Sequence, residues 1–146
     1  MYDTAVPAVN AAVTRVLYLD SSAIVKLILV EPQSAALRTL FASWPSRASS
    51  ALARVEVPRA VQRATCEDPE ASEETRNVLS GFTLIAITDD LLDIAAHLGP
   101  LELRSLDAIH VASALSLGSV LGALVSYDDR LSTAARTAGM HVLSPA

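Results

Sequence analysis

The chain has 146 residues, of which 51% are hydrophobic and 18% are charged. This length suits one compact domain that buries a core without disulfide bonds or a structural metal, and the composition excludes an intrinsically disordered chain. Sixteen acidic and eleven basic residues give a formal net charge of −5. That balance excludes a protein with a generally basic surface, but it leaves room for a local basic patch.

Cysteine content and the N-terminus indicate where such a chain works. Cys66 is the only cysteine, which excludes an intramolecular disulfide and a cysteine-based metal site. The start of the chain has an early Asp3, no basic region and no long apolar core, so it does not resemble a signal peptide. The longest uncharged stretch, residues 111–127, is rich in Ser and Gly and predicts a helix end, a turn and a buried strand. We therefore expect a soluble, cytoplasmic protein without membrane contact.

In the first half of the chain, short apolar runs alternate with amphipathic stretches. The run Val16–Asp20 (VLYLD) is typical of a parallel strand buried on both faces. Ser21 and Ser22 can cap a helix over Ala23–Val30, which Pro32 ends. The next predicted elements are a helix over Ser34–Ser43, a short strand over Ser46–Ser49 and a helix from a cap at Ser49 or Ser50 to about Ala64.

Prolines and glycines mark the boundaries in the second half. Pro58 removes a backbone hydrogen bond and is predicted to kink or restart its helix. The segment Asp68-Pro69-Glu70 predicts a helix start, and this helix should reach about Leu79, with Gly81 past its end. The later predicted elements are a second central strand over Phe82–Ile87, a helix over Asp89–Leu98 capped by Thr88, a helix over Leu106–Leu117 capped by Ser105, a turn over Gly118–Gly122, a strand over Ala123–Ser126, a helix over Asp129–Ala138 and a short strand over His141–Leu143.

This alternation predicts an α/β fold, a three-layer α/β/α sandwich with a mostly parallel central sheet of about four to five strands. No repeat or linker interrupts the pattern, so we expect a single domain. In an open parallel sheet, ligands bind at the carboxyl ends of the strands. Two predicted strands end there in an acid, Asp20 and Asp128.

Two more acids interrupt apolar helical stretches, Glu56 in ALARVEVPRAV and Asp107 in SLDAIHVASAL. A single acid of this kind is more often part of a salt bridge or a helix start than of a site. Four acids in a chain whose only lysine is Lys26 are harder to explain in this way. Carboxylates brought together repel each other unless a divalent cation neutralises them, and oxygen-only ligands favour Mg²⁺ or Mn²⁺ over zinc. Such a site supports metal-assisted phosphodiester hydrolysis.

Four sequence blocks resemble, in order and spacing, those of a PIN domain, and most closely those of the VapC toxins of bacterial toxin–antitoxin pairs. The blocks are VLYLDSSAIVKLILVEP, SSALARVEVPRAVQRA, LRSLDAIHVASAL and LVSYDDRLSTAARTAGM, and they extend from Val16 to about Leu143. The resemblance implies a ribonuclease that needs Mg²⁺ or Mn²⁺, cleaves single-stranded RNA or structured tRNA, rRNA or mRNA, forms a homodimer and is inhibited by a cognate VapB-type antitoxin. Residues 1–15 precede the usual start of such toxins, so we expect a disordered or non-native extension before one PIN domain over 16–146.

The resemblance also assigns roles to individual residues. The catalytic and metal-binding acids would be Asp20, Glu56, Asp107 and Asp128. Among them, Asp20 and Asp107 would be the principal metal ligands, while the other two would assist from further out or orient water. The secondary candidates are Ser22, which would help to hold the metal site, Ser126, a small hydroxyl two residues before the last acid, and Asp129, the alternative in the 128–129 doublet.

Arginines close to these acids are candidates for contacts with RNA phosphates. They are Arg54, Arg59, Arg104 and Arg130, and exposed salt bridges explain each of them equally well. His110, three residues after Asp107, is interpreted as a hydrogen-bonded structural histidine, with a general-base role as the alternative. His97 and His141 are expected to be structural or surface residues, and Trp44 is expected to cover the core rather than stack on a base.

Three other functions remain open. A catalytically weak PIN-like module could bind only RNA or a protein. A phosphatase of the haloacid dehalogenase type would use Asp20 as its nucleophile, but it usually needs a second acid where Ser22 stands. A phospho-acceptor receiver domain needs a lysine late in the chain, and none follows Lys26.

Overall fold

The computed structural model describes residues 14–146, so most of the expected extension over residues 1–15 lies outside the described residues. Its strands form one parallel sheet in the order β3-β2-β1-β4-β5. The strands are β1 (Val16–Leu19), β2 (Ser46–Ser50), β3 (Thr83–Ile85), β4 (Leu121–Val125) and β5 (Val142–Leu143). The helices are α2 (Ser21–Ile28), α3 (Ser34–Ala42), α4 (Ala53–Thr65), α5 (Pro69–Ser80), α6 (Asp89–Ala96), α7 (Ser105–Leu115) and α8 (Asp129–Thr137), with a short 3₁₀ helix η1 (Gly118–Val120).

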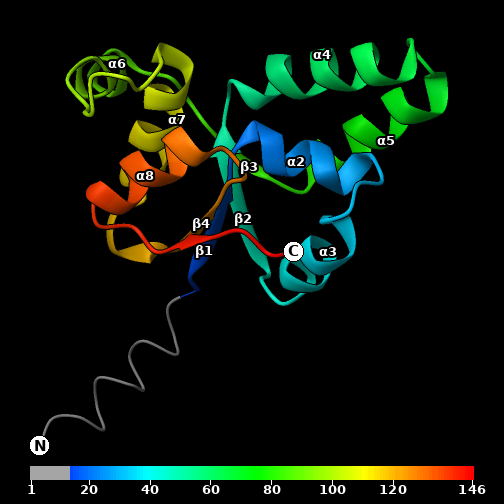
Figure 1. Ribbon diagram of the computed structural model, residues 1–146, viewed down its shortest axis with the longest axis horizontal. Helices are drawn as coiled ribbons and strands as arrows, with labels where there is room; N and C mark the ends of the chain where they lie inside the picture. The colour runs from blue at the N-terminus through cyan, green and yellow to red at the C-terminus, as the bar shows by residue number, and fades with distance from the viewer. Residues whose placement is uncertain (1–13) are drawn as a thin grey trace, which may run out of the picture.

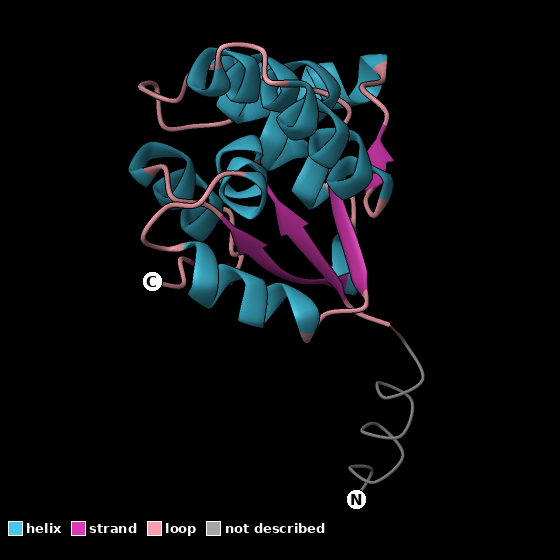
Figure 2. Cartoon of the chain, turned by 90° about the vertical axis from the view of Figure 1, so that its right-hand side faces the viewer, coloured by secondary structure: helices cyan, strands magenta, loops and turns pink. Residues whose placement is uncertain are grey.

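Helices cover both faces of this sheet. Figure 1 shows α2, α3, α4 and α5 on one side of the strands and α6, α7 and α8 on the other, and Figure 2 shows neighbouring strands as arrows that run in one direction between the helices. The alternation along β1 produces the two cores, because Leu17 and Leu19 pack in the core on the α2 side while Tyr18 packs in the core on the α7 side. The predicted α/β/α sandwich is confirmed.

The order of the strands places a binding crevice at a definite point. The chain adds β2 and β3 on one side of β1 and then crosses to add β4 and β5 on the other side. The reversal lies between β1 and β4, whose carboxyl ends are neighbours. Ligands of open α/β sheets bind at such a switch point.

Three predictions about helix starts are wrong. Asp20 caps α2 by accepting a hydrogen bond from the backbone N–H of Ala23, and Ser21 already lies inside that helix. Neither predicted serine caps α4, which follows Leu52 without a side-chain cap. Ser105 is likewise the first residue of α7 rather than its cap. In each case the helix begins one or more residues away from the position that the predicted cap implies.

Two other expectations change with tertiary packing. Of the two alternatives predicted at Pro58, the restart of the helix is wrong, since α4 is continuous across it and buries Val57 and Val61 on either side, while the kink stays a prediction. The segment predicted as a second central strand over Phe82–Ile87 forms only the short edge strand β3, which pairs with β2 alone. Its core-facing residue Phe82 is buried just before the strand begins.

Several predicted features are confirmed. Thr88 caps α6, and Pro69 opens α5 after Asp68. Trp44 packs against the core on the α2 side. A Cβ added at Gly122 would clash with the Trp44 ring, so this position in β4 favours glycine. Within residues 14–146, no helix is long and apolar enough to cross a membrane.

Candidate active site

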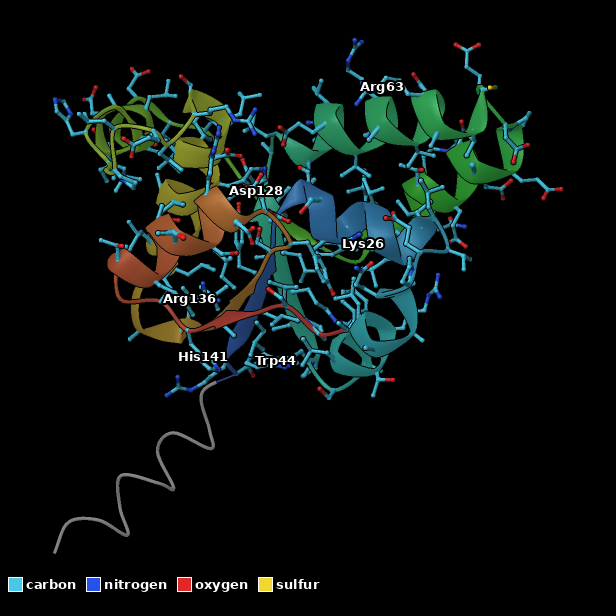
Figure 3. All side chains as sticks on the ribbon, in the orientation of Figure 1. Lys26, Trp44, Arg63, Asp128, Arg136 and His141 are labelled. Atoms are coloured by element: carbon cyan, nitrogen blue, oxygen red, sulfur yellow. The ribbon has the colours of Figure 1, made fainter. Side chains whose placement is uncertain are left out.

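The predicted acids come from four elements that meet at the carboxyl end of the sheet. Asp20 directly follows β1, Asp128 lies three residues after β4, Glu56 belongs to α4 and Asp107 lies in the first turn of α7. Figure 3 shows Asp128 at this end of the sheet, between α2 and α8. The fold therefore brings these acids to the switch point between β1 and β4.

Asp20 is built into the fold. It is 2% exposed, and its Oδ1 accepts hydrogen bonds from the Ser22 hydroxyl at 2.7 Å and the Ala23 backbone N–H at 2.9 Å. The Ser126 hydroxyl donates to Oδ2. Burial raises the pKa of Asp20, and these hydrogen bonds offset the increase only in part. Both serine candidates thus contact this carboxylate.

Asp107 and Asp128 face a shared cation instead. Arg104 Nε lies 3.6 Å from Asp107 Oδ2, and Arg104 Nη2 lies 3.8 Å from Asp128 Oδ2. Among the residues that the structure describes, the buried Asp107 Oδ2 has no hydrogen-bond partner. Burial and the negative charge of Asp128 raise the pKa of Asp107, and Arg104 offsets this increase only in part. Asp128 also caps α8 through the Leu131 N–H at 2.9 Å.

Glu56 is held by a third set of contacts. Its Oε1 accepts a hydrogen bond from the Ser21 hydroxyl at 2.7 Å and lies 2.8 Å from Nε2 of His110. On the other side of the ring, His110 Nδ1 lies 2.7 Å from the Tyr18 hydroxyl. Burial raises the pKa of Glu56, but the hydrogen bonds from His110 and Ser21 outweigh it and hold this pKa below its ordinary value.

Ser126 and Arg104 connect three of these acids. Ser126 donates to Asp20 and accepts from the Asp128 backbone N–H at 3.1 Å, and Arg104 reaches from Asp128 to Asp107. Within residues 14–146, no group of three or more His, Cys, Asp or Glu side chains is arranged closely enough to hold a metal ion. Mg²⁺ usually binds one or two carboxylates and keeps several waters. The oxygen-only donors and the unpartnered Asp107 Oδ2 fit that mode of binding.

Comparison with known proteins identifies the family. The model of the PIN-domain family matches residues 17–137. The chain belongs to the PIN-domain family. Ribonuclease VapC46 of Mycobacterium tuberculosis is 48% identical over 129 residues, which cover 88% of this chain and 97% of the relative. Ribonuclease VapC47 of the same species is 38% identical over 133 residues, with coverage of 88% and 96%. The predicted membership of the VapC toxins is confirmed.

Solved structures agree on the PIN fold. The crystal structure of Mycobacterium tuberculosis VapC20, described as a Sarcin-Ricin loop cleaving toxin, superposes with a TM-score of 0.70 at 18% identity and covers 88% of this chain and 99% of its own. A toxin–antitoxin complex from Klebsiella pneumoniae gives a TM-score of 0.61 at 21% identity, with coverage of 77% and 86%. Both likenesses support the three-layer architecture.

The arginine candidates of this PIN domain lie apart from one another. Within the described residues, Arg104 is the one arginine candidate that forms ion pairs with the acids, and it pairs with both Asp107 and Asp128. Arg54 lines a cavity of about 420 Å³ between α4 and α5 together with Arg76. Arg59 lines a separate cavity of about 180 Å³, and Arg130 lines one of about 300 Å³. All four candidates are exposed.

The remaining candidates separate clearly in position. Asp129 is exposed in the first turn of α8, so it is Asp128 that faces Arg104. His141 lies at the opposite end of the sheet from Asp128 (Figure 3). His97 is exposed, with its Nδ1 3.0 Å from the Asp93 carbonyl oxygen.

Sequence reasoning missed two polar residues in the site. Tyr18 lies in an apolar strand, where an inward aromatic is expected to pack, and Ser21 was interpreted only as a helix cap. The interpretation of His110 as a hydrogen-bonded structural histidine is confirmed by its contacts with Tyr18 and Glu56, and its spacing from Asp107 already placed it on the same helical face. That spacing was the available signal.

Proposed function

We propose that this PIN domain is a Mg²⁺- or Mn²⁺-dependent endoribonuclease that hydrolyses phosphodiester bonds of single-stranded RNA and acts as the toxin of a toxin–antitoxin pair. The observation that carries the proposal is the convergence of four carboxylates at the switch point, one of which, Asp107, keeps a buried oxygen without a hydrogen-bond partner within residues 14–146. The names of the curated relatives, ribonucleases VapC46 and VapC47, support the reaction class.

Asp20 and Asp107 would hold the metal ion, and Glu56 and Asp128 would assist from further out. When bound, the ion lowers the pKa of an attacking water and stabilises charge on the phosphate and the leaving oxygen. The serines that bond to Asp20 keep its carboxylate in one orientation, so it needs no rearrangement to act as a ligand. The hydrogen bonds that the structure gives Glu56 all reach Oε1. Its Oε2 can therefore accept a hydrogen bond from a water.

Binding of RNA would rely on arginine rather than on net charge. Arg104 is 67% exposed beside the acids and can offer its guanidinium to a phosphate of the cleaved strand. Arg54, Arg59 and Arg130 are exposed, form no ion pair with the acids within the described residues, and would contact flanking phosphates. The total charge of −5 then disfavours indiscriminate binding without preventing a local contact.

The proposed biological setting follows from the relatives. One solved neighbour is a toxin–antitoxin complex, and we propose that a VapB-type antitoxin binds and inhibits this chain. We further propose a homodimer in the cytoplasm, with residues 16–146 as its single PIN domain. Light scattering that shows a monomer at all concentrations would contradict the dimer.

Cleavage of labelled single-stranded RNA tests the proposed function. The antitoxin-free chain is incubated with Mg²⁺, Mn²⁺ or EDTA, beside an Asp107→Asn variant and the exposed control Asp93→Asn. Cleavage that needs the metal, disappears in Asp107→Asn and persists in the control supports the proposal. Retarded RNA without metal-dependent cleavage would instead favour a binding module.

A further inference from the structure

A continuous chain of hydrogen bonds runs from the core to Glu56. Tyr18 and His110 are 0% and 2% exposed. Nδ1 of His110 lies 2.7 Å from the Tyr18 hydroxyl, and Nε2 lies 2.8 Å from Glu56 Oε1 and 3.3 Å from the Ser21 hydroxyl. Tyr18 and Glu56 are separated from His110 in sequence by 92 and 54 residues. This series of hydrogen bonds therefore joins β1, α7 and α4 through side chains alone.

The chemistry of its two ends fixes the direction of this chain. Oε1 of Glu56 already accepts a hydrogen bond from the Ser21 hydroxyl, and an ionised carboxylate has no proton to donate, so the contact at 2.8 Å requires an N–H at Nε2 of His110. A neutral imidazole protonated at Nε2 has its lone pair at Nδ1. The buried Tyr18 hydroxyl, 2.7 Å from Nδ1, therefore donates a hydrogen bond to this lone pair.

We propose that Tyr18 and His110 are positioning residues, which orient Glu56 through the hydrogen-bond chain Tyr18 O–H to Nδ1 and Nε2–H to Oε1. This inference rests on the proposed function, because it assigns to Glu56 a part in RNA cleavage. The Ser21 hydroxyl donates to the same oxygen, so Oε1 is used for holding and Oε2 is left for water or metal. Tyr18 lies two residues before Asp20 on β1. One central strand thus supports two of the acids.

Two nearly isosteric substitutions test His110. The amide nitrogen of His110→Gln can approach the position of Nε2, whereas His110→Asn places its amide near Nδ1 and removes the donor that His110 provides to Glu56, leaving that of Ser21. We expect His110→Asn to lower kcat by about 10- to 100-fold, the usual effect of losing an outer hydrogen-bond partner around a metal site, with KM for RNA unchanged. The loss in His110→Gln is expected to be smaller. Equal losses in the two variants would overturn the proposal.

A double-mutant cycle shows whether His110 acts through Glu56. In a Glu56→Gln background, His110→Asn is expected to cause no further loss of kcat, because the residue that it positions has already been changed. Losses that multiply would mean that His110 contributes independently of Glu56, and they would overturn the proposal.

The tautomer of His110 provides a readout that needs neither metal nor RNA. Nitrogen-15 NMR of the metal-free protein is expected to show a proton on Nε2 and none on Nδ1, and Tyr18→Phe is expected to produce a mixture of tautomers. A proton on Nδ1 in the unsubstituted protein would overturn the proposal. Absence of RNA cleavage by the unsubstituted protein would contradict the proposed function instead. The NMR measurement would still decide the direction of the hydrogen bonds between Tyr18, His110 and Glu56.

Discussion

Asp20 and Asp107 lie at the same end of the sheet, but the fold treats their carboxylates in opposite ways. Asp20 is 2% exposed and accepts hydrogen bonds from two hydroxyls and one backbone N–H. The Asp107 side chain is 19% exposed, and among the described residues its one ion-pair partner is the Arg104 guanidinium, at 3.6 Å. Burial raises the pKa of both groups. Asp20 is therefore held in place by hydrogen bonds, whereas the negative charge of Asp107 is only partly compensated and is available for a bound cation to stabilise.

Substituting Asp20 and Asp107 in turn tests this difference most strongly. Both Asp20→Ala and Asp107→Ala are expected to lower metal-dependent cleavage by about 100-fold or more, because the proposed metal ligand is removed. Only Asp20→Ala is expected to lower the free energy of unfolding, by about 1–2 kcal/mol, since it also removes the cap of α2. Cleavage assays and urea denaturation measure the two effects. Asp129→Asn is the control, and equal stability losses in the two alanine variants would contradict the comparison.

Metal binding in the absence of RNA tests separately whether Asp107 binds the ion. At a Mn²⁺ concentration of about 100 times Kd, the free energy of unfolding should rise by about 2.7 kcal/mol. This increase is expected to disappear in Asp107→Asn, and urea denaturation with Mn²⁺ or EDTA measures it. A full increase in Asp107→Asn would show that the under-compensated acid does not bind the ion.

The pH dependence of stability separates Asp107 from Glu56 in the metal-free protein. A raised pKa means that ionisation of Asp107 costs folded-state stability, so Asp107→Asn should gain stability over the unsubstituted protein as pH rises from about 4 towards 7. A lowered pKa means that ionised Glu56 stabilises the fold. Glu56→Gln should therefore be the less stable protein above about pH 4.5, and this deficit should vanish as pH falls through the lowered pKa. Curves of the same sign for the two variants would refute the assignment.

The smallest expected effect concerns Arg104. Because its side chain is 67% exposed, Arg104→Gln should change the free energy of unfolding by less than about 0.5 kcal/mol. Affinity for single-stranded RNA should fall, and the slope of log K against log salt should decrease by about 0.7 if one phosphate contact is lost. Arg136→Gln, at the far end of α8, is the matched control. An unchanged slope in Arg104→Gln would remove this residue from the RNA contacts.

Local pattern was sufficient for much of the fold. The apolar run before Asp20 and the helix signals at Asp68-Pro69 and Thr88 predicted elements that the structure contains, because burial on both faces and capping leave marks within a few residues. The same local marks misplaced Phe82–Ile87 at the centre of the sheet. Strand order depends on pairing between distant segments, and such pairing leaves no periodic mark in the sequence.

The same distinction between local pattern and long-range packing applies to the candidate site. The amino-acid sequence was enough to select the candidate acids, since a carboxylate in an apolar stretch, such as Glu56 or Asp107, is costly to bury and therefore points to a special role. Only the tertiary structure decided which groups hold them. Tyr18 looks like an ordinary core aromatic until the fold brings it to His110, and Arg104 looks like any exposed arginine until it lies between two carboxylates. Hydrogen bonds and ion pairs act over a few ångströms, so partners far apart in the chain are selected by the packing of β1, α4, α7 and α8.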